Sequence, residues 1–121
     1  MIDAIIMTAA LALPNTDTHE PRWMQPSRSA PSADVSFLRC VIRHESAHSG
    51  GPTAHNPRSS AAGLFQFLGS TWRGIAKWVP SAHGYSSASQ APASVQWEVA
   101  LHAVKNGGHS MWRGTHCGHG T

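Results

Sequence analysis

Residues 35–48, VSFLRCVIRHESAH, carry the pattern that decides the fold. Leu38, Val41 and Ile42 recur at the spacing of one face of an α-helix, and Glu45 falls on that same face. We therefore expect an amphipathic helix whose apolar face ends in a carboxylate. Apolar surroundings desolvate the charged form of a carboxyl group, which raises its pKa and suits it to donate a proton.

The rest of the chain predicts more helix and no strand. Asp34 is the expected N-cap of the first helix. Residues 70–79 and 92–106 also show helical spacing of apolar residues, and they are followed by Pro80 and Gly107 respectively, which end helices. No segment of useful length alternates apolar and polar residues. The sequence therefore predicts a mainly α fold.

A change in composition divides the chain in two. Residues 14–34 contain four prolines and predict an arm without regular structure. The apolar run at residues 5–13 has the length of a signal-peptide core, but no Lys or Arg precedes it. We expect an apolar segment and a Pro/Ser-rich arm over residues 1–34, and one folded domain over residues 35–121.

Length and charge narrow the function classes. A chain of 121 residues predicts one domain with a modest core. The net charge of +3 suits an anionic polymer such as a bacterial wall. It is too small for nucleic acid, and no cluster of basic residues is interleaved with aromatics. No stretch reaches the roughly 20 apolar residues that span a bilayer, so no transmembrane segment is expected.

The two cysteines, Cys40 and Cys117, leave two alternatives open. They can form one disulfide, which implies an oxidising compartment. They can equally be two separate buried thiols, because free cysteine is commonly buried.

Residues 44–48, HESAH, also fit the zinc-peptidase pattern H-E-x-x-H. On a helix, His44 and His48 would lie one turn apart and could share a zinc ion, with Glu45 activating a water molecule. The extended pattern needs a third histidine where Ala54 stands, and His55 comes one residue late. A zinc site at His44 and His48 is therefore the less favoured hypothesis.

Four blocks of the sequence together match one family. They are CVIRHES at residues 40–46, Asn56-Pro57, SSAAGLFQF at residues 59–67, and Ser70-Thr71-Trp72. In order and spacing they resemble the lysozyme-like transglycosylase superfamily. The resemblance is closest to the resuscitation-promoting factor type and to actinobacterial and phage lysin catalytic domains. It covers about residues 35–117.

The resemblance implies a small lysozyme-like fold with Glu45 as the general acid/base and no cofactor. It implies substrate contacts for Phe65, Gln66, Thr71 and Trp72. Trp72 also has the spacing of a core residue relative to the residues that follow it.

The resemblance also places a disulfide between Cys40 and Cys117. It implies that the substrate is the peptidoglycan glycan strand, cleaved at the β-1,4 bond between MurNAc and GlcNAc.

The number of carboxylates bears on the mechanism. Residues 32–121 contain Asp34, Glu45 and Glu98 as their only acidic residues. Asp34 lies roughly 16 Å from Glu45 along a continuous helix, at 1.5 Å per residue. We therefore expect one glutamate that acts first as acid and then as base. In the family it resembles, the sugar's own 6-hydroxyl is the nucleophile, and water remains open as an alternative.

Three functions follow from these patterns, in decreasing order of support. The first is a secreted muralytic enzyme, either a lytic transglycosylase or a lysozyme-type hydrolase, located outside the cell or at the wall. The second is a phage virion or tail component that carries a lysozyme-like domain, with virion or wall protein partners bound through residues 1–34. The third is the zinc peptidase.

Overall fold

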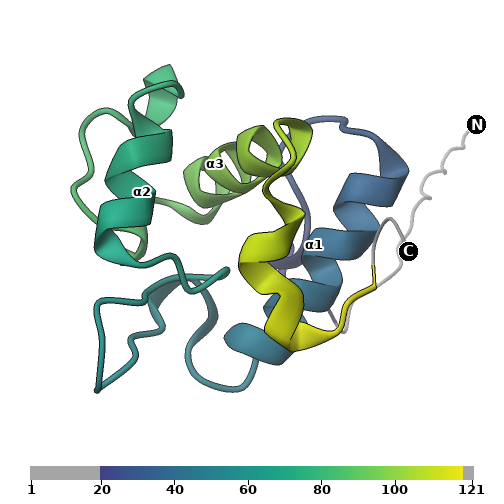
Figure 1. Cartoon of the computed structure of the whole chain (residues 1–121), viewed down its shortest axis with the longest axis horizontal. Coiled ribbons are helices and arrows are strands. Elements are labelled where there is room, and N and C mark those ends of the chain that lie inside the picture. Colours follow the sequence, from purple (N-terminus) through teal and green to yellow (C-terminus); the bar gives the residue numbers. More distant parts are fainter. Residues whose placement is uncertain (1–19, 119–121) are drawn as a thin grey trace, which may run out of the picture.

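The computed structural model describes residues 20–118, which form a mainly helical unit (Figure 1). Its α-helices are α1 (Ser32–Glu45), α2 (Gly69–Ala76) and α3 (Ala93–Lys105). Short 3-10 segments link them, and the longest, η6 (Gly108–Thr115), follows α3. Between residues 20 and 118 only isolated β-bridges occur, and no strand forms. The predicted mainly α fold is confirmed, and it is consistent with a small lysozyme-like domain.

Helix α1 lies beside α3, which occupies the middle of the unit, and α1 packs against both α3 and η6 (Figure 1). Its apolar face buries Phe37, Leu38, Val41 and Ile42, as the spacing predicts. The helix begins at Ser32, with Pro31 as its N-cap, so Asp34 lies in the first turn and is not the cap. Proline is tolerated at this position because its missing N–H would have no partner inside the helix.

Aromatic rings fill the core between the helices. Phe65 meets Trp97 edge to face, with ring centroids 5.2 Å apart, and Phe67 meets Trp112 at 5.6 Å. Trp72 of α2 lies 5.8 Å from Phe67. Each indole N–H is satisfied by a backbone carbonyl, as buried tryptophans require: Trp72 by Tyr85, Trp97 by Trp23, and Trp112 by Phe65.

Residues that precede α1 pack onto this core. Met24 is buried, and the Trp23 carbonyl accepts the hydrogen bond from Trp97 at 2.8 Å. The 3-10 turn Arg22–Met24 lies within the stretch that was expected to lack regular structure. The division of the chain at residue 34 stays a prediction.

Two expectations concern residues that the structure does not describe. The apolar run at 5–13, and most of the arm proposed to contact virion or wall proteins, lie within residues 1–19, outside the described part. Between residues 20 and 118, none of the helices combines the length and apolarity that crossing a bilayer requires.

Candidate functional site

Glu45 is the last residue of α1, at the end of the helix's apolar face. Its side chain is half-buried. Within residues 20–118 its carboxylate makes no hydrogen bond or ion pair, so no donor stabilises the charged form. Burial raises the pKa of Glu45, and the neighbouring charge of His44 opposes that rise. The carboxyl group therefore has the environment that a proton donor needs.

The other acidic side chains of the described part are held elsewhere. Glu98 of α3 accepts two hydrogen bonds from Arg28, at 2.8 and 2.7 Å. Glu20 pairs with Arg39 and Arg43. Asp34 lies in the first turn of α1, where the helix dipole favours a negative charge. Glu20 and Glu98 are thus engaged with arginines, whereas Glu45 pairs with no positive side chain within residues 20–118.

Ser46 fixes the end of α1 against the loop at residues 61–67. Its hydroxyl is buried and donates a hydrogen bond to the Leu64 carbonyl at 2.7 Å. Its backbone N–H closes the last turn of the helix on Ile42 at 2.9 Å. The loop that contains the predicted substrate contacts Phe65 and Gln66 is therefore joined directly to the residue after Glu45.

Within this loop, Gln66 is the predicted substrate contact whose side chain is partly exposed. Gln66 adopts a left-handed backbone with φ of 53°, and it is half-buried. Its Nε2 donates to the Gly63 carbonyl at 3.0 Å, which orients the amide and leaves its oxygen without a partner among the described residues. A free, oriented amide oxygen can accept a hydrogen bond from a ligand N–H.

Phe65 and Trp72, which were also predicted to contact substrate, belong to the core. Both side chains are fully buried, with 0% of their surface exposed. Their rings pack among other aromatics, so stacking of either ring on a sugar is not part of this arrangement. Thr71, on the first turn of α2, is half-buried and keeps a partly open surface.

The sequence did not point to Gln96, which holds the same loop from the other side. Gln96 lies on α3 and is fully buried, yet every polar atom of its amide is paired. Its Oε1 accepts from the Leu64 N–H at 2.7 Å, and its Nε2 donates to the Pro52 and Ala91 carbonyls at 2.9 Å each. The signal in the sequence that could have indicated Gln96 was a single polar residue on the inner face of an apolar helix.

Gly63 explains why the loop can approach Gln96 so closely. Its φ of 81° lies in the left-handed region, where glycine has no steric penalty. A Cβ at this position would also collide with the Gln96 Oε1 atom and lie 2.9 Å from the Ala88 Cβ. Backbone packing therefore requires glycine at position 63.

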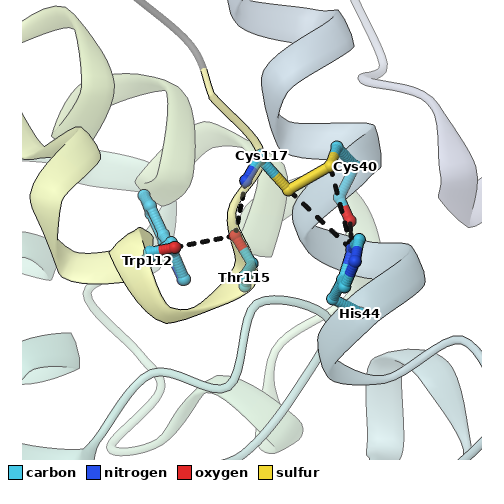
Figure 2. The surroundings of a disulfide bond; sticks show 5 residues. All are labelled: Cys40, His44, Trp112, Thr115 and Cys117. Atoms are coloured by element: carbon cyan, nitrogen blue, oxygen red, sulfur yellow. Dashed lines mark hydrogen bonds between the residues drawn. A yellow bond between two sulfur atoms is a disulfide. The ribbon is translucent and has the colours of Figure 1, made fainter. Parts of the chain in front are cut away.

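Cys40 and Cys117 form a disulfide that ties α1 to the end of η6 (Figure 2). The bridge closes a sequence separation of 77 residues. This pairing decides between the two alternatives left open for the cysteines. On the Cys117 side, Thr115 Oγ1 accepts from the Cys117 N–H at 3.3 Å and donates to the Trp112 carbonyl at 2.7 Å (Figure 2).

The histidines of the zinc pattern do not share a helix face. The helix ends at Glu45, and Ser46 leaves the helical region with φ of −141°, so His48 lies in the following turn. His44 instead turns its Nδ1 back toward the Cys40 carbonyl, 3.0 Å away (Figure 2).

Among residues 20–118, the only group of three metal-ligating side chains within mutual reach is His44 with Cys40 and Cys117. Both of these sulfur atoms are joined in the disulfide, and His48 is not part of the group.

Comparison with known proteins shows similarity to staphylococcal transglycosylases. The chain is 40% identical over 77 residues to the probable transglycosylase SceD of Staphylococcus haemolyticus, which covers 64% of the chain and 31% of that protein. It is 36% identical over 89 residues to the probable transglycosylase SceD of Staphylococcus aureus strain Newman, covering 71% and 36%. The comparisons support a transglycosylase family.

The chain spans about a third of the length of these relatives. No protein-family model matches it. No solved structure matches it either. Because the relatives are staphylococcal proteins, they give no support to the narrower resemblance to resuscitation-promoting factors and phage lysins, or to a phage or actinobacterial origin.

Proposed function

We propose that this chain cleaves the glycan strand of peptidoglycan, at the β-1,4 bond between MurNAc and GlcNAc, with Glu45 as the general acid. The observation that carries the proposal is the half-buried, unpaired Glu45 carboxyl group, whose pKa is raised by burial. Glycoside cleavage needs a carboxylic acid that stays protonated until it donates to the leaving oxygen. The similarity to proteins named transglycosylases supports the same reaction class.

In this mechanism Glu45 protonates the glycosidic oxygen as the bond to the sugar breaks. The resulting carboxylate then takes a proton from the nucleophile. If the nucleophile is the 6-hydroxyl of the same sugar, the product is a 1,6-anhydro sugar; if it is water, the product is a reducing end. Either route uses Glu45 twice, first as acid and then as base.

The arrangement of the acidic residues favours this single-carboxylate route. Glycosidases with two catalytic carboxyl groups place them roughly 5–10 Å apart across the bond that is cleaved. Glu98 and Glu20 are engaged with arginines, and Asp34 lies at the opposite end of α1. We propose that Gln66 and Thr71 contact the substrate beside Glu45, and that Phe65 and Trp72 support them from the core.

The same reaction places the protein outside the cell or in the wall, where its substrate lies. The Cys40–Cys117 disulfide supports that location, because disulfides persist in oxidising compartments.

Digestion of purified peptidoglycan, followed by mass analysis of the products, tests this function. We expect muramyl ends, either anhydro or reducing, and the distribution between them identifies the nucleophile. A parallel digestion with a metal chelator should proceed at the same rate. Cut peptide stems, or loss of activity with the chelator, would contradict the proposal and favour a metallopeptidase.

A further inference from the structure

Trp78 is the most exposed large apolar side chain in the described part of the chain, with 66% of its surface open to solvent. It lies just after α2, in a segment that faces α3 across a hollow. A tryptophan in this position contributes nothing to the core, and large exposed apolar groups beside a hollow commonly mark binding sites. Lys77 Nζ lies 5.7 Å from the centroid of the indole, a cation–π contact that orients the ring.

Three hollows adjoin one another along the outer face of α3. The first, of about 510 Å³, is lined by Trp78, His102 and Met111, and it shares Trp78 and His102 with the second, of about 400 Å³. The second shares Arg28 and Glu98 with the third, of about 420 Å³. Each volume lies in the range of small-ligand sites.

Together the hollows form an elongated groove, which we call the α3 groove. Its α3 wall runs from Ser94 to Lys105, which is roughly 16 Å at 1.5 Å per residue. Facing α3, residues 78–81 line one side of the groove, and residues 27–31 with Asp34 line the other. A groove of this shape fits a linear polymer better than a single compact molecule.

The charges that line the groove balance, so the groove favours the uncharged groups of a polymer over its charged groups. Arg28 and Lys105 stand among its lining residues with Asp34 and Glu98, so the two kinds of charge balance. Arg28 and Glu98 are already bonded to each other. A balanced groove gives no electrostatic attraction to nucleic acid or another polyanion. The groove is also lined by the indole of Trp78, the imidazole of His102 and the amide of Asn106.

We propose that the α3 groove is a second, non-catalytic binding site for the glycan strand of peptidoglycan, with Trp78 as its platform. The apolar face of an N-acetyl sugar can lie on the indole while its hydroxyl and acetamido groups meet the polar side chains around it. This inference rests on the proposed function, because that function supplies the glycan as the partner.

The groove is separate from the candidate catalytic site. Asp34, in the first turn of α1, lines the second hollow, whereas Glu45 ends the same helix. The two residues are 11 positions apart, or roughly 16 Å along the helix axis. The α3 groove would therefore hold the enzyme on polymeric wall material and leave the bond-breaking step at Glu45 unchanged.

The test compares binding and cleavage in matched variants. Binding to purified insoluble peptidoglycan is measured by co-sedimentation in a Glu45→Gln background, so that the wall is not digested. Trp78→Ala should weaken binding roughly five- to tenfold, the effect of losing one aromatic contact. Trp78→Phe should restore most of it. Leu68→Ala, which removes another exposed apolar side chain outside these hollows, should leave binding unchanged.

In the Glu45 parent, Trp78→Ala should cleave short soluble muropeptide chains at the normal rate and insoluble wall more slowly. Wall binding by Trp78→Ala equal to that of the parent would overturn the α3 groove proposal. The proposal would also be overturned if Trp78→Ala kept its wall binding but lost self-association in sedimentation velocity. That result would assign the groove to a second copy of the chain. Failure of the proposed function is seen separately, as undiminished cleavage by Glu45→Gln.

Discussion

At the scale of single residues, the proposed reaction depends on the protonation of Glu45. Burial raises the pKa of this group, and the positive charge of His44 lowers it again. The same two influences act on stability. The folded state holds the Glu45 proton more tightly than the unfolded chain does. Protonation of Glu45 therefore stabilises the folded state fully below the unfolded pKa of about 4.5, and this stabilisation is lost as the pH rises through the folded pKa.

The rate of wall cleavage should therefore fall on the alkaline side, as Glu45 loses its proton. Removing His44 takes away the charge that opposes the raised pKa, so His44→Ala should move this alkaline limb to higher pH. His48→Ala is the matched control, because His48 lies beyond the end of the helix and should leave the limb in place. The measurement is the pH dependence of kcat/KM on a soluble substrate. A limb that His44→Ala leaves in place or moves to lower pH contradicts this assignment.

At the scale of elements, one side chain holds three segments in place around the site. Gln96 of α3 bonds the backbone at Leu64, Pro52 and Ala91, and Ser46 bonds the Leu64 carbonyl from α1. Buried side chains thus hold both the N–H and the carbonyl of Leu64. This explains how a loop without regular secondary structure can keep a defined position beside Glu45.

Replacing Gln96 by leucine should reduce the free energy of unfolding by about 2–4 kcal/mol, because three buried backbone groups lose their partners. Gln25→Leu is the matched control: Gln25 is exposed and its side chain makes no hydrogen bond within residues 20–118, so its loss should change stability by less than about 0.5 kcal/mol. Urea denaturation of both variants checks the difference. Equal stability of the two would show that the Gln96 hydrogen bonds do not hold the loop.

The helices could be predicted from the sequence, but their ends and the roles of several motif residues could not. Periodicity locates Leu38, Val41 and Ile42 on one buried face, and this was confirmed. The end of α1 at Glu45 depends on the tertiary bond from Ser46 to Leu64, which no local pattern reports.

A family motif likewise does not say whether a residue contacts the ligand or supports the wall behind it. Phe65 and Trp72 have aromatic chemistry suited to sugars, yet both are buried. Gln96 was missed for the converse reason. One glutamine in an apolar helix acquires its meaning only when α3 packs against the loops at residues 52, 64 and 91.

At the scale of the whole molecule, the disulfide joins the first helix to the end of the described chain. Cys40 and Cys117 enclose α2, α3 and η6 between them. A cross-link of this span mainly restricts the unfolded chain. Small domains with a modest core often depend on such a constraint.

Changing both cysteines to serine should lower the free energy of unfolding by about 4.5 kcal/mol, the value that chain entropy gives for a loop of 77 residues. The double variant avoids leaving one reactive thiol. Thermal melting of the oxidised parent, the reduced parent and the double variant should place the last two together, well below the first. Alkylation of two thiols in the oxidised, unfolded parent would contradict the bridge.

The central claim is that Glu45 alone carries the acid–base chemistry, and the most direct test is release of glycan fragments from purified peptidoglycan by Glu45→Gln. Glu20→Gln serves as the control, because that carboxylate pairs with arginines of α1. We predict that Glu45→Gln loses at least about a hundredfold in rate, the usual contribution of a general acid. It should melt no lower than the parent at neutral pH, and Glu20→Gln should keep its activity. Glycan release by folded Glu45→Gln at the parental rate would contradict the claim.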